Sequence, residues 1–202
     1  MPLQKLATFA ESSVYLCMTL EEFLKMLGCL PKECIAVRGD GAGTCIETTR
    51  AFIRICKHFG FNAEPLAVSC AVVNDNWSVG VGFDESKFTP EAVQILQAPK
   101  AANGHLVVWL PEHRVLIDPT LHATASRPQH GLVIGAMVRV TVPPEFDAGD
   151  ACSFGDGSVT ITYQRSDWDG WRFSHAWQGD KAANKSYSNM IIAGLEQLTP
   201  SS

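Results

Sequence analysis

The chain has 202 residues, of which 46% are hydrophobic and 18% are charged, and its formal net charge is -5 at pH 7. This length suffices for one compact domain with a sizeable core, and the composition is that of an ordinary globular protein. Lysine and arginine form no runs, so the chain lacks the clustered positive charge that holds nucleic-acid backbones or anionic membrane surfaces. We therefore expect neither nucleic acid nor a membrane among its partners.

The N-terminal region and the cysteines indicate the compartment. No apolar run approaches the ~20 residues of a membrane-spanning helix, and glutamates interrupt the N-terminal stretch where a signal peptide needs an apolar core. The seven cysteines are odd in number and include no C-x-x-C pair. Free cysteines usually pack as small hydrophobic residues. We expect reduced thiols, a cytoplasmic protein, and no metal or cofactor.

Helices are predicted in the first part of the chain. Capping boxes of the form T-x-x-E begin two of them, at residues 19–28 and 44–60, and each of these ends at a glycine. In the second helix Thr44 is the expected N-cap, which puts Cys45 at the first helical position. Residues 3–17 form a further expected helix.

From residue 66 onward the hydrophobic period changes to two, which is typical of strands. The predicted strands are residues 66–73, 105–110, 115–118, 132–140, 159–164 and 171–177. A long connection over 74–103, with a short helix at 89–93, has a length that favours lining or covering a site. Residues 185–198 form an expected terminal helix. We predict a single α+β domain over 1–202, with N-terminal helices packed on a mostly antiparallel sheet.

Cys45 is the candidate nucleophile. The N-terminus of a helix stabilises a thiolate through its partial positive charge and free N–H groups, and the same groups can hold an oxyanion. Gly41 and Gly43, just before the cysteine, would let a substrate approach the backbone closely. The alternative is that Cys45 is a core residue like the other cysteines.

A base and a group to orient it are predicted in the hairpin 105–118, whose turn lies around Pro111 and Glu112. A symmetric loop of two or four residues places His105 directly opposite Asp118, whereas a three-residue loop without a bulge puts them on opposite faces. In the first case the carboxylate can fix the imidazole tautomer, and the imidazole can act as base and then acid. Taken alone, His105 could be an ordinary strand histidine and Asp118 the start of a turn.

The order of these residues resembles a known family. A cysteine at a helix start, a histidine beginning a strand, and the run Ile117-Asp118-Pro119-Thr120 ending the next strand look like the transglutaminase-like family of the papain-like cysteine-protease superfamily. The resemblance covers residues 38–122, with the strands and helix of 132–198 outside it. It implies a papain-like fold and a Cys45–His105–Asp118 triad acting on a peptide, protein or small-molecule amide.

A second resemblance uses the same residues. The segment Arg38 to Glu47, followed by Gly60-Phe61, is similar to the arylamine N-acetyltransferases, although this chain has extra residues between Arg38 and Cys45 and lacks their continuation after the aspartate. Our leading hypothesis is a cysteine-dependent hydrolase or acyltransferase that works through a thioester. The alternatives are an acetyl-CoA-dependent acetyltransferase, or a non-catalytic transglutaminase-like binding module.

Other histidines and aromatic residues are expected to be structural. His58 lies near the end of the second helix, where a cation is favourable. His175, in the sequence S-H-A-W, is not followed by an Asp-Pro-Thr run, so it is not the expected base. Trp171, Phe173, His175 and Trp177 would share one face of the last predicted strand. Core packing is the preferred explanation, and an acyl- or peptide-binding surface is the alternative.

Overall fold

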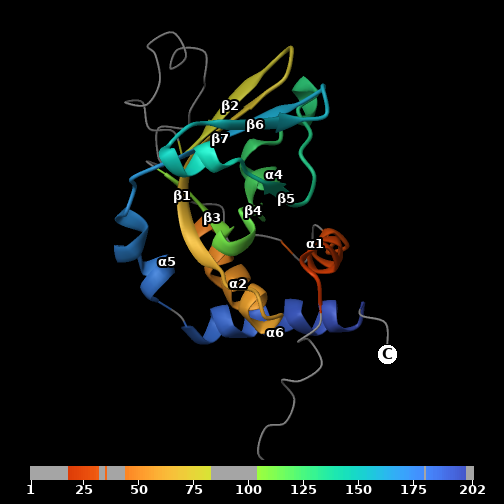
Figure 1. Cartoon of the computed structure of the whole chain (residues 1–202), viewed down its shortest axis with the longest axis vertical. Coiled ribbons are helices and arrows are strands. Elements are labelled where there is room, and N and C mark those ends of the chain that lie inside the picture. The colour runs from red at the N-terminus through yellow and green to blue at the C-terminus, as the bar shows by residue number, and fades with distance from the viewer. Residues whose placement is uncertain (1–17, 32–34, 36–43, 83–103, 180, 199–202) are drawn as a thin grey trace, which may run out of the picture.

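The computed structural model describes residues 18–31, 35, 44–82, 104–179 and 181–198. Within these ranges the protein is α+β (Figure 1). Its helices are α1 (Leu20–Gly28), α2 (Thr44–His58), α4 (Leu121–Ala125), α5 (His175–Gln178) and α6 (Lys181–Glu196). Its strands are β1 (Glu64–Val73), β2 (Ser78–Val81), β3 (His105–Leu110), β4 (Val115–Asp118), β5 (Val138–Thr141), β6 (Cys152–Gly155) and β7 (Thr160–Arg165).

The strands form one antiparallel sheet with the order β5-β4-β3-β1-β7-β6. Strand β1 lies at its centre and pairs with β7 along one edge. Along the other edge β1 pairs first with β3 and then with β2. The strands that carry the predicted histidine and aspartate are therefore interior strands rather than edges.

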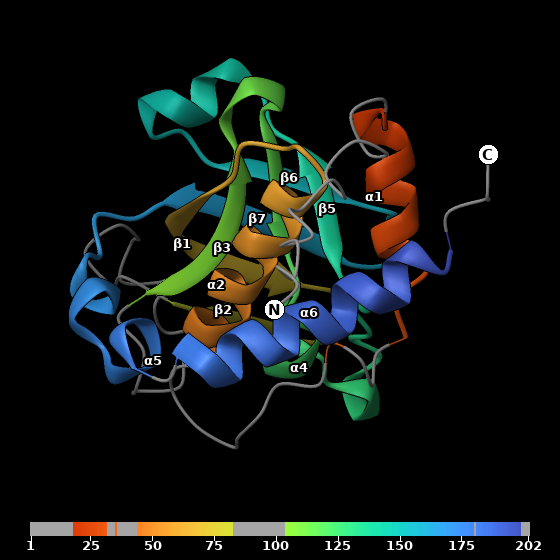
Figure 2. The same ribbon diagram turned by 90° about the horizontal axis from the view of Figure 1, so that it is seen from below.

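Both faces of the central strands are covered, so every residue of β3 and β4 is buried. On one face, α1, α2 and α6 pack against alternate residues of the two strands, among them Val108 and Ile117. On the other face, Val107 and Leu116 pack against α4 and the inner residues of β1 and β7. Figure 2 shows α1, α2 and α6 together on one side of the sheet. Burial on both faces explains why these strands are continuously apolar rather than alternating.

Most of the predicted elements are confirmed. The strands over 105–110 and 115–118 have the predicted bounds, and those predicted at 66–73 and 159–164 correspond to β1 and β7. The terminal helix is also confirmed, although α6 begins earlier than expected, at Lys181. The capping box of α1 is present, because Thr19 and Glu22 satisfy each other's backbone N–H groups. The prediction omitted the short strands β2 and β6.

Two predicted strands are wrong in whole or in part. Residues 171–177 form a 3₁₀ turn (Gly170–Phe173) followed by α5, because the Ser174 side chain accepts a hydrogen bond from the Trp177 N–H and starts a helical turn. The aromatic residues therefore do not share one face: Trp171 is buried, whereas Phe173 is 74% exposed. Of residues 132–140, only Val138 onward is a strand, with an isolated bridge at Leu132.

Helix α2 carries the predicted nucleophile. Its residues Ile46, Thr49 and Cys56 are buried, as its apolar pattern predicted, and Gly60 follows it with a positive φ of 86°. Thr44 is the first residue of the helix, so Cys45 lies in its first turn. The predicted helices at 3–17 and 89–93, and Gly41, Gly43 and Arg38, lie outside the described residues.

Candidate active site

The turn between β3 and β4 sets the relative positions of the histidine and the aspartate. The strands pair Val108 with Ile117 and Leu110 with Val115, so the turn has four residues, 111–114. Arg114 adopts the left-handed conformation there, with φ 55°. Continuing this register places His105 two residues out of line with Asp118, so the prediction of direct opposition is wrong. Because the offset is even, both side chains still leave the same face of the sheet, as diagonal neighbours.

The two side chains meet in the protein interior. The distance between Nε2 of His105 and Oδ2 of Asp118 is 2.6 Å, and both residues are almost completely buried. An N–H of the ring donates to the carboxylate. This leaves Nδ1 as the ring nitrogen that is free to face another group.

Cys45 approaches this pair from the first turn of α2. The His105 side chain and the Leu106 backbone lie close enough to its sulfur that hydrogen bonding to them lowers the pKa of the thiol. The Thr49 hydroxyl, one turn later, donates to the Leu106 carbonyl oxygen at 2.8 Å. These contacts hold the N-terminal end of α2 against the N-terminal end of β3. The structure therefore brings together all three residues that the sequence singled out.

The charges of the three groups favour an ion pair. Burial alone would raise the pKa of the Cys45 thiol, but the hydrogen bond and positive charge of His105 outweigh it, and the pKa lies below its ordinary value. Burial would lower the pKa of His105, but the charge and hydrogen bond of Asp118 raise it to about 10. These shifts favour a thiolate beside an imidazolium over a neutral thiol beside a neutral imidazole.

Asp118 is held by a full set of donors. Its Oδ1 accepts hydrogen bonds from the Thr120 N–H at 3.0 Å, the Thr120 hydroxyl at 3.1 Å and the Leu121 N–H at 3.0 Å. Its Oδ2 accepts the Tyr163 hydroxyl at 2.7 Å as well as His105. Burial would raise the pKa of this carboxyl, but His105 and these donors hold it below its ordinary value.

Tyr163 is a site residue that the sequence did not identify. It lies on β7, three strands from β4 in the sheet, and is completely buried. The Cys70 thiol of β1 lies near its hydroxyl, and the interaction contributes to a raised pKa of Tyr163, although burial is the main cause. A buried tyrosine is expected to have a polar partner, but its sequence position does not say which one.

Two glycines allow close packing around His105. A Cβ on Gly82, which has φ +62°, would lie 2.2 Å from the His105 backbone nitrogen. A Cβ on Gly104 would lie 2.1 Å from the ring of Trp168. The histidine strand is thus fitted closely against β2 on one side and an indole on the other. Isolated glycines in strand patterns are signals for such close approach, and this pair was not used in the prediction.

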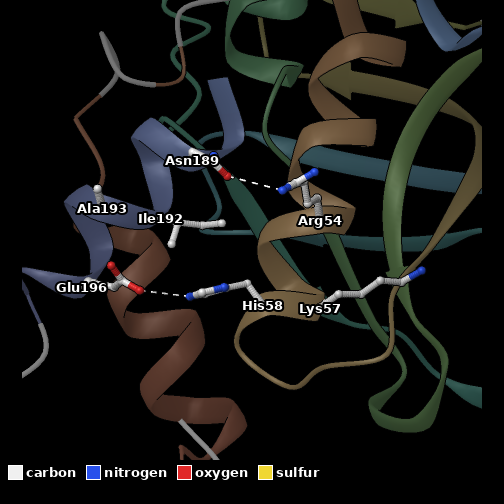
Figure 3. A pocket seen from close by; sticks show the side chains of 7 residues that line it. All are labelled: Arg54, Lys57, His58, Asn189, Ile192, Ala193 and Glu196. Carbon is white, nitrogen blue, oxygen red and sulfur yellow. Dashed lines mark hydrogen bonds and ion pairs between the residues drawn. The ribbon is translucent and has the colours of Figure 1, made fainter. Parts of the chain in front are cut away.

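His58 and His175 are two further histidines that were considered from the sequence. His175 is exposed on α5, and His58 pairs with Glu196 of α6 at 3.0 Å, which agrees with its expected structural role. A hollow of about 480 Å³ lies between the C-terminal end of α2 and α6 (Figure 3). Its lining contains none of the three triad residues. Two side-chain pairs bridge it, His58 with Glu196 and Arg54 with Asn189 at 3.4 Å, so we interpret it as a seam between helices.

In the part of the chain that the structure describes, no three histidine, cysteine, aspartate or glutamate side chains gather in a way that could hold a metal ion. None of the described helices is both long and apolar enough to cross a membrane. Cys29, Cys45, Cys56, Cys70 and Cys152 are free thiols.

Comparison of the chain with protein-family models, curated proteins and solved structures gives no match. The functional argument therefore depends on the geometry of the site itself.

Proposed function

We propose that this chain is a cysteine-dependent hydrolase or acyltransferase that acts on an amide or peptide-type carbonyl. The observation that carries the proposal is the contact of Cys45 with His105, whose other ring nitrogen is bonded to the buried carboxylate of Asp118. A nucleophile, a base and a group that orients the base are the components of covalent acyl transfer.

The proposed reaction has two steps. In the first, the Cys45 thiolate attacks the carbonyl carbon, a C–S bond forms, and the C–N bond breaks as the His105 imidazolium gives its proton to the leaving nitrogen. In the second, neutral His105 takes a proton from a water molecule whose oxygen attacks the thioester carbon; the C–S bond then breaks, the acid is released, and the Cys45 thiolate and the His105 imidazolium are restored. An amine that replaces water gives transfer instead of hydrolysis. The N–H groups in the first turn of a helix have no intrahelical partner, so those of α2 are the candidates for stabilising the oxyanion in both steps.

The arrangement of elements supports the transglutaminase-like assignment, which includes a papain-like fold. The proposed nucleophile begins a helix that packs on the sheet, the histidine begins β3 and the aspartate ends β4. A non-catalytic binding module would be favoured by a shielded thiol or by a triad whose members do not meet. Cys45 is instead partly exposed and in contact with His105.

Alkylation of the thiols as a function of pH tests this proposal. Iodoacetamide, with mapping by mass spectrometry, is expected to modify Cys45 well below pH 9.0, the ordinary pKa of a thiol. Exposed Cys29 serves as the internal reference on the same molecule. His105→Ala is expected to move the Cys45 profile to higher pH, because burial then acts on the thiol without a neighbouring cation.

An unchanged profile in His105→Ala would contradict the proposed ion pair. Incubation with acetyl-CoA separates the reaction classes: rapid acetylation of Cys45 favours the acetyltransferase alternative, whereas hydrolysis of amides or esters without it favours the hydrolase. Cys45→Ser is the control for ester hydrolysis by other side chains.

A further inference from the structure

A cluster of tryptophans lies beside the proposed nucleophile. Buried Ile46, Ala67, Leu106 and Trp171 form a small apolar cluster that is separate from the two large cores. Cys45, Trp168, Ala176 and Trp177 are partly buried and pack against it. We call Trp168, Trp171 and Trp177 the aromatic wall. The thiol and two of these indoles, those of Trp168 and Trp177, keep some exposure to solvent.

Trp177 is fixed to the helix that carries the thiol. Its ring lies 4.5 Å from that of Trp171, at an interplanar angle of 78°. The Arg50 guanidinium of α2 donates to the carbonyl oxygens of Ala176 at 3.3 Å and Gly179 at 2.9 Å. Helix α5 therefore packs on α2. Figure 2 shows α5 close to the beginning of α6, whose Asn184 donates to the Glu47 carbonyl oxygen at 2.9 Å.

Trp168 is fixed to the strand that carries the base. Its ring covers Gly104, where a Cβ would lie 2.1 Å from the indole. Its backbone N–H donates to the Ser166 hydroxyl at 3.2 Å. The wall is thus attached both to the nucleophile helix and to the residue before His105. Its position relative to the thiol is set before any substrate arrives.

On the basis of the proposed function, we propose that the substrate of Cys45 carries a bulky apolar acyl group, aromatic or long aliphatic. This group packs on the exposed parts of Trp168 and Trp177. Indole faces gain free energy by covering apolar surface and by stacking with aromatic rings. Phe173, on the same segment, is 74% exposed and is not part of the cluster. Within the described residues, Trp168 and Trp177 are the large aromatic side chains that pack against the same cluster as the thiol and keep some exposure.

A series of p-nitrophenyl esters tests this inference. Acetyl, hexanoyl and phenylacetyl esters are compared by the burst of nitrophenolate and by the mass of acylated Cys45. In the wild-type protein, kcat/KM is expected to rise about tenfold or more from acetyl to the larger groups, the range that a few buried methylenes give. Trp177→Ala is expected to remove most of this rise.

Two further variants make the result specific. Phe173→Ala is the matched control and is expected to retain the full preference for large acyl groups. Trp177→Leu keeps apolar bulk and guards against misfolding, and it is expected to lie between wild type and Trp177→Ala for the hexanoyl ester. The rate of Cys45 alkylation by iodoacetamide, a small reagent, checks that the thiol is intact in each variant.

The outcomes separate this inference from the proposed function. If all three esters acylate Cys45 with equal efficiency, the aromatic wall is not an acyl-binding site, and the proposed triad is unaffected. The proposed acyl site would also be overturned if the double variant Trp177→Ala/Trp168→Phe kept the preference for large acyl groups. Absence of any Cys45-dependent acylation would overturn both proposals.

Discussion

Asp118 accepts hydrogen bonds from several residues of the site. A buried carboxylate is costly unless donors surround it. Here both oxygens are used: Oδ1 by Thr120 and Leu121, and Oδ2 by His105 and Tyr163. The carboxylate thereby stays ionised and cannot rotate freely, and the imidazole that it binds has one preferred orientation. Its own position is fixed first by the local turn that follows β4.

Replacing Tyr163 by phenylalanine tests the role of the distant donor. Tyr163→Phe keeps the ring in the core but removes one hydrogen bond to Asp118, so the pKa of Asp118 is expected to rise. We expect a loss of about 1.5–3 kcal/mol in the free energy of unfolding, as for hydrogen bonds to charged groups. The loss in kcat/KM is expected to be about tenfold, or ~1.4 kcal/mol of transition-state stabilisation.

The measurement is a denaturant titration together with a pH profile of ester hydrolysis. If Tyr163 positions the triad, the acid limb of the profile moves to higher pH in Tyr163→Phe. Tyr187 of α6 is partly buried and packs against the core that contains Phe23 and Phe52. Tyr187→Phe is therefore the matched control for the loss of a tyrosine hydroxyl. If Tyr163→Phe loses stability but the acid limb of its pH profile does not move, Tyr163 has only a structural role.

At the scale of elements, the site lies where the N-terminal end of helix α2 meets the N-terminal end of strand β3. Helix α2 begins at Thr44 and β3 begins at His105, so the nucleophile and the base both lie where an element starts. Thr49 and Leu106 hold these two beginnings together by a buried hydrogen bond. The residue before β3 is a glycine covered by Trp168, which makes this boundary sensitive to size.

Adding a single methyl group at this boundary is expected to be costly. Gly104→Ala places a Cβ against the Trp168 ring, and overpacking of this kind costs about 1–3 kcal/mol in the free energy of unfolding. Gly135→Ala is the matched control, because no atom lies within 4 Å of the added carbon there. Urea unfolding of both variants is the measurement. Equal stabilities of the two variants would mean that Trp168 moves away at little cost.

At the scale of the whole molecule, curvature of the sheet closes the site. Strands β4 and β7 are separated by β3 and β1, and in a flat sheet this would place them about 14 Å apart. Nevertheless the Tyr163 hydroxyl lies 2.7 Å from Asp118. Bending of the sheet and the length of the tyrosine side chain together account for the contact. The carboxylate is consequently sealed from water by residues of distant strands.

The stability of the whole molecule should depend on pH through His105. In a Cys45→Ala background, which removes the opposing titration of the thiol, His105 retains the charge and hydrogen bond of Asp118 and keeps a raised pKa. Between pH 6.5, its ordinary pKa, and the higher pKa of the folded protein, the folded state binds more protons than the unfolded state. The free energy of unfolding therefore falls as pH rises, by at most ~1.4 kcal/mol per pH unit.

Replacing Asp118 is expected to reverse this behaviour. In Cys45→Ala/Asp118→Asn the buried imidazole has no counter-charge, so burial lowers its pKa below 6.5. The His105 contribution to stability then disappears above this pH and becomes destabilising below it. Denaturant titrations of both variants from pH 5.5 to 9 measure the difference. Parallel curves for the two variants would contradict a charged His105–Asp118 pair.

Local patterns were enough to predict much of this protein. The capping box at Thr19, the strands at 105–110 and 115–118, and the candidate residues Cys45, His105 and Asp118 all follow from short-range signals: cap chemistry, short apolar runs of strand-forming residues, and motif spacing. The same-face relation of His105 and Asp118 was predicted only for an even loop length, and the structure supplied that condition with its four-residue turn.

Features that depend on long-range contacts were decided by the tertiary structure alone. Residues 171–177 alternate like a strand but fold as two short turns, because Ser174 caps α5 and Arg50 of α2 holds its end. The partnership of Tyr163 with Asp118 and the packing of Trp168 on Gly104 each join segments more than 40 residues apart in the chain. Such contacts depend on how far the sheet bends and on how helices pack against it, which are properties of the whole core and of no single segment.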